Sequence, residues 1–188
     1  PLASLLTATE TLIRYWERLD KEKINERLER VREQVEHMTA ITEDVLQLSR
    51  LQMRRAKYEP EAGDLDGLCA HVVSKLAELP DVGRRIVYAC AEHPLNAVFD
   101  ARLIEQVINN LLHNALKYSP AEKPVQISLA HADGKITLRI TDEGIGIPPE
   151  SLKHLFEPFH RAGNVGAISG TGLGLPIAKE AVELHDGT

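Results

Sequence analysis

Apolar residues in the first third of the chain recur at intervals of three and four, the period of an amphipathic helix. Residues 1–57 contain no glycine, and their only proline is Pro1. We therefore predict two helices, over residues 1–18 and 21–56, separated by a short polar turn in RLDKEK. The apolar stripe of the second helix consists of Ile24, Leu28, Val31, Val35, Met38, Ile41, Val45 and Leu48.

This stripe is too long and too narrow to be buried by one partner helix. An antiparallel hairpin that pairs with a second copy in a four-helix bundle accounts for it. The alternative is a single hairpin packed on the domain that follows. The pattern therefore favours a homodimer formed through residues 1–57.

Beyond residue 57 the composition changes, and the pattern predicts mixed strands and helices. We predict helices over residues 65–78 (after the capping residue Asp64), 101–119, 149–156 and 173–185. RRIVYACA and LNAVFD are predicted strands, and VQISLAHADGKITLRITD is a predicted β-hairpin. In this hairpin apolar and polar residues alternate, and Asp133 and Gly134 suit a tight primed turn.

Composition and charge narrow the class of protein. A hydrophobic content of 43% and a charged content of 27% are globular values, and a net charge of −6 argues against a nucleic-acid-binding surface. Cys69 and Cys90 each lie in an apolar run, which favours buried free thiols in a reducing compartment. There is neither a long apolar run nor a signal-peptide layout, so we predict a cytoplasmic location, compatible with a parent protein anchored in the inner membrane.

The helix predicted over residues 101–119 carries an unexpected polar stripe. Asparagine is disfavoured in the interior of a helix, yet Asn110 and Asn114 both lie within this one and share a face with Lys117. Amide oxygens suit a hard cation, and a neighbouring lysine suits phosphate. A solvated helix face is the alternative interpretation.

Two glycine-rich stretches add candidate chemistry. In DEGIGIPPE, Asp142 is placed to accept hydrogen bonds from an exocyclic amine, and the glycines leave room for a flat ligand. GTGLGL precedes a helix, so its backbone N–H groups and the helix N-terminus suit a phosphate. It lacks the GK[ST] ending of a Walker A loop, and no strand directly precedes it as in a Rossmann fingerprint. A plain turn and a flexible linker are the alternatives.

In their order along the chain, these motifs resemble those of the sensor histidine kinases of two-component systems, relatives of gyrase, Hsp90 and MutL. NNLLHNALKYS resembles the N box, DEGIGI the G1 box, LFEPFHR the F box, GTGLGL the G2 box, and PLASLL the tail of the H box. The resemblance spans essentially the whole chain and implies an α+β fold. Residues 1–57 would form the dimerisation and phosphotransfer hairpin of a dimeric four-helix bundle, and residues 58–188 a two-layer α/β sandwich of the Bergerat type that binds ATP.

The resemblance implies roles for individual residues. Asn110 and Asn114 would hold Mg²⁺, Lys117 would contact the ATP phosphates, and Asp142 would accept the adenine amino group. The other nucleotide-binding residues that it implies are Tyr118, Gly144, Gly146, Ile147, Arg161, Gly170, Thr171, Gly172, Leu173 and Gly174. Phe156 and Phe159 would anchor the base of a mobile lid over residues 161–172.

The implied reaction moves the γ-phosphoryl of ATP to a histidine on the hairpin, then to an aspartate on a response-regulator receiver domain. ATP-hydrolysing relatives carry a glutamate at the position of Asn110, and an amide cannot take a proton from water. The alternatives are a GHKL-type ATPase and a non-catalytic nucleotide-binding or dimerisation module.

The resemblance also predicts that the chain is a piece of a larger kinase. The acceptor histidine would lie five residues ahead of Pro1, and none of the eight histidines present has an H-box context. The last strands of the family's fold would follow Thr188.

Overall fold

The computed structural model describes residues 2–16, 19–52, 58–79, 82, 85–166, 168 and 170–188. Its helices are α1 (Leu2–Tyr15), α2 (Lys21–Gln52), α3 (Leu65–Ala77), α4 (Ala101–Tyr118), the 3₁₀ helix η2 (Pro149–His154) and α5 (Gly174–Glu183). Its strands are β1 (Glu61–Asp64), β2 (Ile86–Cys90), β3 (Asn96–Phe99), β4 (Val125–Ala132) and β5 (Lys135–Thr141). Within these described ranges no helix has the length and hydropathy needed to span a membrane.

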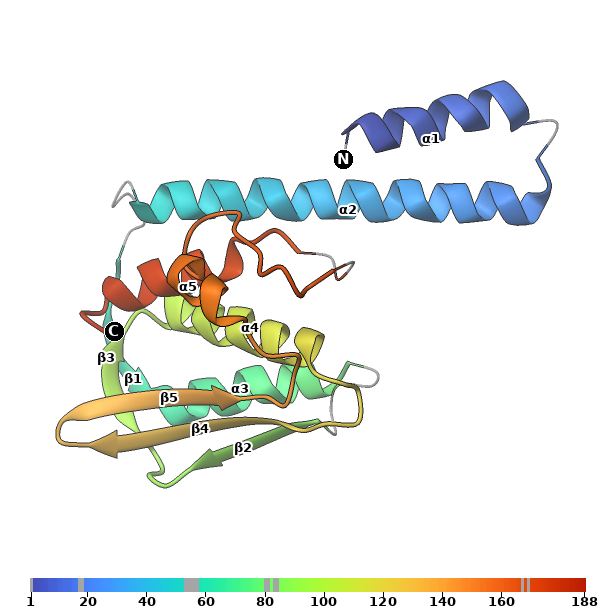
Figure 1. The fold of residues 1–188 in the computed structure, drawn as a ribbon. Coiled ribbons are helices and arrows are strands. Elements are labelled where there is room, and N and C mark those ends of the chain that lie inside the picture. Colours follow the sequence, from blue (N-terminus) through green and yellow to red (C-terminus); the bar gives the residue numbers. More distant parts are fainter. Residues whose placement is uncertain are drawn as a thin grey trace.

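The two N-terminal helices form a hairpin in which α1 lies alongside α2 (Figure 1). Asp20 is the N-cap of α2, since its Oδ1 accepts a hydrogen bond from the backbone N of Lys23 at 2.8 Å. Leu12 is buried, whereas Leu28 and Val35 of the predicted stripe remain 47% and 49% exposed. The predicted helices are confirmed, and their predicted ends at residues 17–18 and 53–56 lie outside the described residues.

The C-terminal part is a two-layer α/β sandwich in which α3 and α4 lie on one side of the sheet (Figure 1). Strand β4 is central: it pairs parallel with β2 and antiparallel with β5. Asp133 and Gly134 have φ of 51° and 71°, so the predicted primed turn of the β4–β5 hairpin is confirmed. The α+β fold class predicted from the motifs is therefore correct.

One strand has no counterpart in the sequence pattern. EAGD forms β1, which pairs antiparallel with β3 in a separate two-stranded sheet. Its four residues show no apolar alternation, so backbone hydrogen bonding to β3 decides its conformation. The predicted helix over residues 149–156 also differs, because it is a 3₁₀ helix that ends at His154.

The first hydrophobic cluster fills the space between the sheet and helices α3 and α4. Its buried residues are Cys69, Val72, Leu76, Leu95, Ile108, Leu112, Ala115, Val125, Ile127 and Leu129. Burial raises the pKa of the Cys69 thiol to about 12, so the prediction of a buried free thiol is correct there. Cys90 differs: it is only partly buried, and its Sγ donates to the carbonyl of Glu92 at 3.1 Å.

A second hydrophobic cluster joins α4 to α5 and to the hairpin helix α2. Its buried residues are Leu48, Leu103, Val107, Leu173, Ile177, Ala178 and Ala181. Helix α4 therefore contacts apolar surface on two sides. The helical hairpin and the α/β sandwich consequently share part of their buried apolar surface.

Asp100 is the N-cap of α4, and it is buried, with 4% of its surface exposed. Its carboxylate accepts from the backbone N–H groups of Glu59, Arg102 and Leu103 at 3.1–3.2 Å. Burial alone would raise the pKa of Asp100, but these N–H groups and the Arg102 guanidinium together hold it below its ordinary value of 3.8.

We expect Asp100→Asn to lower the free energy of unfolding at neutral pH by about 1–2 kcal/mol, because the amide keeps an acceptor but loses the charge. Because the folded-state pKa is lowered, the carboxylate's contribution is complete above pH 3.8 and is lost as the pH falls through the folded value. Urea denaturation of the unsubstituted chain and of Asp100→Asn across this pH range tests the prediction. The difference between their free energies of unfolding should become smaller in acid, and a difference independent of pH would refute this account. Asp133→Asn, in the exposed hairpin turn, serves as the control.

Candidate functional site

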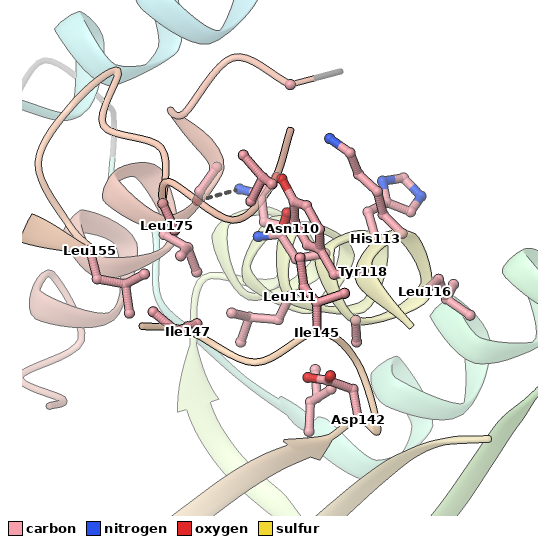
Figure 2. Close-up of a pocket in the computed structure, with 18 of the residues that line it drawn as sticks. Asn110, Leu111, His113, Leu116, Tyr118, Asp142, Ile145, Ile147, Leu155 and Leu175 are labelled. Atoms are coloured by element: carbon pink, nitrogen blue, oxygen red, sulfur yellow. Dashed lines mark hydrogen bonds between the residues drawn. The ribbon is translucent and has the colours of Figure 1, made fainter. Parts of the chain in front are cut away.

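A cavity of about 1090 Å³ lies beside α4, between the segment after β5 and the segment before α5. This volume is slightly above the ~300–1,000 Å³ that is usual for a small-molecule or cofactor site, so the cavity has room for such a ligand. Most of the residues singled out in the sequence line this cavity, as the close-up in Figure 2 illustrates. They are Asn110, Asn114, Lys117, Tyr118, Asp142, Gly146, Ile147, Arg161, Gly170, Thr171, Gly172 and Gly174.

Gly144 and Leu173 are not among the residues that line the cavity. Leu173 is fully buried in the second hydrophobic cluster, because an apolar side chain just before α5 gains more from that core than from a solvated pocket. Gly144 helps to position the lining residue Asp142, because its backbone N donates a hydrogen bond to Asp142 Oδ1 at 2.8 Å. A Cβ on Gly144 would lie 2.6 Å from the carbonyl oxygen of Tyr118.

The polar end of the cavity is where α4 meets the glycine-rich segment. Nδ2 of Asn110 donates to the carbonyl of Gly174 at 3.1 Å. Lys117 reaches the same segment, because its Nζ lies 2.7 Å from where a Cβ on Gly170 would stand. Within the described part of the chain, no carboxylate pairs with Lys117 and no group hydrogen-bonds the half-buried Asn114 side chain. A positive charge and an amide are therefore available to a ligand.

Asp142 lies at the other end of the labelled group, away from Asn110 (Figure 2). Its Oδ1 accepts from Gly144 N at 2.8 Å and from Ser119 Oγ at 3.4 Å, and the side chain lines the cavity. Between the two ends the wall is largely apolar, formed by Leu111, Leu116, Ile145, Ile147, Leu155 and Leu175. The cavity thus combines the Asp142 carboxylate at one end, an apolar middle and a polar, cationic end.

Arg85 fixes the end of α4 that carries Lys117 and Tyr118. Its guanidinium donates to the carbonyls of Leu116, Ser119 and Pro120 at 3.3, 3.2 and 2.9 Å. The last carbonyls of a helix have no partner within the helix, so these bonds hold the helix terminus in place. No motif around Arg85 indicates this role, because its partners lie more than thirty residues away.

The predicted lid, residues 161–172, is closed at its base by backbone contacts. The N–H of Phe159 donates to the carbonyl of Gly172 at 3.1 Å. Gly172 has φ of 74°, and a Cβ there would lie 2.8 Å from the carbonyl carbon of Phe159, so this close approach requires glycine. The rings of Phe156 and Phe159 are 48% and 60% exposed. The contact at the base of the lid is therefore made by the Phe159 backbone.

Within the lid, Arg161 donates to the carbonyl of Ile168, so this segment is also held by its own side chain. Arg161 also lines the cavity.

The helical hairpin contributes a residue that the sequence did not indicate. Asp44 of α2 lines the cavity, and its Oδ2 accepts a hydrogen bond from Thr171 Oγ1 at 2.7 Å. Thr171 Oγ1 also accepts from Leu173 N at 3.2 Å, just ahead of α5. Asp44 lies on the polar face of α2, where an acidic residue is ordinarily solvated. Only the folded structure brings it to the glycine-rich segment.

We expect Gly144→Ala to reduce ADP affinity by more than tenfold, because the new methyl group would displace the Tyr118 backbone and Asp142. Gly163→Ala is the matched control, since a Cβ there has no neighbour within 4 Å. Isothermal titration calorimetry measures both affinities, and circular dichroism verifies folding. Equal affinities in the two variants would show that Gly144 does not shape the site.

We expect Asp44→Ala to speed amide hydrogen exchange in residues 161–172, because the lid loses a charge-assisted hydrogen bond worth ~1.5 kcal/mol, about tenfold in opening. Hydrogen exchange followed by mass spectrometry tests this. Glu43→Ala, exposed and one residue earlier, is the control. Unchanged exchange in Asp44→Ala would mean that the Thr171 contact does not hold the lid.

Comparison with protein families gives two matches, separated by residues 55–98. Residues 1–54 match the His Kinase A (phospho-acceptor) domain. Residues 99–188 match the histidine kinase-, DNA gyrase B- and HSP90-like ATPase family. The cavity described above is built mainly from the second of these regions, with Asp44 from the first.

Individual relatives agree with these matches. Sensor histidine kinase YkoH of Bacillus subtilis is 32% identical over 184 residues, which cover 97% of this chain and 39% of YkoH. The chain spans between 29% and 39% of the length of the first curated relatives it matches.

Solved structures give the same assignment. The Acinetobacter baumannii histidine kinase AdeS matches with a TM-score of 0.74 and 26% identity, over 97% of this chain and 83% of AdeS. The mycobacterial sensor histidine kinase MprB is 31% identical with a TM-score of 0.57, over 69% of this chain and 83% of MprB. On the motifs, the fold and these matches, the chain belongs to the sensor histidine kinases.

Proposed function

We propose that this chain is the core of a sensor histidine kinase that binds Mg-ATP and transfers its γ-phosphoryl to a histidine on the helical hairpin. The acceptor would lie five residues ahead of Pro1, and a response-regulator aspartate would receive the phosphoryl group next. The observation that carries the proposal is the group of amides, lysine and glycines on α4 and the lid, gathered at one end of a cofactor-sized cavity. ATP use follows from the match to an ATPase family.

The proposed adenine end is formed by Asp142 and the apolar wall beside it. The Asp142 carboxylate accepts one hydrogen bond from Gly144 N, and its two oxygens can accept more than that. An exocyclic amine of a ligand is a complementary donor. Tyr118, Ile145 and Ile147 line the cavity nearby and offer apolar surface to a flat ring. The close approach of Gly144 to the Tyr118 carbonyl keeps this wall in position.

Asn110, Asn114 and Lys117 fit the phosphate end. Hard cations such as Mg²⁺ take oxygen ligands and are usually held by few protein groups together with substrate phosphates. With Nδ2 of Asn110 bonded to Gly174, its Oδ1 is the atom left for a cation, and the Asn114 amide has no described partner. The ion would neutralise the charge that develops on the transferred group, and the Lys117 ammonium would add to this.

The acidic residues of the cavity favour phosphoryl transfer over hydrolysis. The carboxylates that line it, among the described residues, are Asp44 and Asp142. Asp142 belongs to the proposed adenine end, and Asp44 is hydrogen-bonded to Thr171. Asn110 has no basic group to activate water. Catalysis would then rest on positioning and charge neutralisation, with the acceptor histidine as the nucleophile.

Residues 1–57 and 58–188 are proposed as the dimerisation and the catalytic units, with the hairpin joining two copies. Large apolar side chains of the hairpin remain exposed in the single chain: Leu6 at 59%, Ile13 at 82%, Leu28 at 47% and Val35 at 49%. A second hairpin would cover this surface in a four-helix bundle. A response-regulator receiver domain is the proposed partner for the second transfer, on the cytoplasmic side of any membrane.

The test uses the chain extended upstream to include the proposed acceptor, incubated with γ-labelled ATP and Mg²⁺. We expect label on the protein that survives base and is lost in acid, as a phosphoramidate behaves. Asn114→Ala should reduce labelling more than tenfold, because the cation loses a ligand. The exposed Asn25→Ala, also on a helix, is the matched control and should label normally.

Other outcomes would replace this proposal. Free phosphate without protein-bound label would indicate a GHKL-type ATPase. Mg²⁺-dependent nucleotide binding without either product would indicate a non-catalytic binding module. Label that resists acid would place the phosphoryl group on a residue other than histidine.

A further inference from the structure

A second group of potential ligands lies at the opposite end of α3 from the cavity. Asp66 is in the first turn of α3, Cys90 ends β2, and His93 follows in the connection to β3. One ligand atom from each of these residues lies within 4.8 Å of the others. The cavity, by contrast, is lined by Leu76 and Leu79 at the far end of the same helix and just beyond it.

Hydrogen bonds orient these three side chains toward one another. The Asp66 carboxylate is 14% exposed, accepts from the Tyr88 hydroxyl at 2.5 Å through Oδ1, and lies 2.6 Å from His93 Nδ1 through Oδ2. Cys90 Sγ is held at 3.1 Å from the carbonyl of Glu92. Supporting hydrogen bonds of the Tyr88 kind are typical around carboxylates that bind metals.

The three ligand groups favour some metal ions over others. A sulfur, an imidazole nitrogen and a carboxylate oxygen are the ligand types that Zn²⁺ takes, whereas Mg²⁺ and Ca²⁺ prefer oxygen alone. We propose that Asp66, Cys90 and His93 form a site for Zn²⁺, or for an ion with the same ligand preference, separate from the nucleotide cavity. Three protein ligands leave the fourth tetrahedral position to water.

Binding requires a small movement that the structure allows. Two ligands of one tetrahedral Zn²⁺ lie about 3.3 Å apart, so the 2.6 Å contact between His93 and Asp66 must open. The His93 side chain is 61% exposed and can turn outward, while the better-buried Asp66 stays with Tyr88. The ion replaces the proton shared by Nδ1 and Oδ2, and the Cys90 thiol releases its proton to form the metal–sulfur bond.

An ion here would link the start of α3 to the end of β2 and the following connection. These segments already meet through hydrogen bonds such as Tyr88 to Asp66 and the backbone N of Leu65 to the carbonyl of Leu95. A ligand that binds only the folded state stabilises it by mass action. The site would therefore make the stability of the ATP-binding part depend on the available zinc, without contact with the nucleotide.

Cobalt titration of the 188-residue chain tests the proposal, because Co²⁺ reports both thiolate ligation and tetrahedral geometry in its absorption spectrum. We expect one equivalent to give a thiolate-to-cobalt charge-transfer band with visible bands of a tetrahedral ion. Zn²⁺ should abolish them, and excess Mg²⁺ should leave them intact. Zn²⁺ should also raise the melting temperature measured by circular dichroism.

Variants assign the ligands. Cys90→Ser should lose the charge-transfer band, and His93→Gln and Asp66→Asn should weaken Co²⁺ binding more than about tenfold. His71→Gln, exposed on the same helix α3, is the matched control and should bind as the unsubstituted chain does. If Cys90→Ser does not fold, His93→Gln, at an exposed position, still tests whether these residues bind the ion. Absence of the band, or a band that survives in Cys90→Ser and His93→Gln, would overturn the site.

Discussion

Helix α4 is packed against apolar surface on two sides, and this constraint decides where the cavity lies. Ile108, Leu112 and Ala115 face the sheet cluster, whereas Leu103 and Val107 face α5 and α2. With two sides committed, the helix keeps one polar stripe, which carries Asn110, Asn114 and Lys117 to the cavity. Rotation of α4 about its axis would remove buried side chains from both clusters, so the stripe has one orientation.

The glycine-rich segment is positioned by the same packing. Leu173 is buried in the second cluster, immediately before α5, and so fixes the distance between the lid and α4. The Phe159 bond to Gly172 and the Asn110 bond to Gly174 then hold this segment on either side of Leu173. None of the described residues of the lid, 161–172, is buried, which is typical of segments that open and close.

The contact between Asp44 and Thr171 couples the hairpin to the lid. In this arrangement α2 both closes the second cluster, through Leu48, and supplies a wall of the cavity. Any movement of the α/β sandwich relative to α2 would have to break or shift this contact. The hairpin is therefore placed to influence the lid and the cavity beside it.

Several features were accessible from sequence because they depend on local physics. The three-and-four spacing defined α2, alternation and the Asp133–Gly134 turn defined the β4–β5 hairpin, and Asp64 marked the start of α3. The four motif boxes led to the family. Local pattern did not indicate β1, since EAGD has no apolar period and forms a strand only because β3 is beside it.

Tertiary structure alone decided which residues surround the cavity and which support it. The sequence could group Asn110, Asn114 and Lys117, because a helix has a fixed 100° step. It could not show that Leu173 belongs to the core, that Arg85 holds the end of α4, or that Asp44 reaches Thr171. Local spacing determines the face on which a side chain lies. Its neighbours across the fold depend on how whole elements pack, and that information is not local.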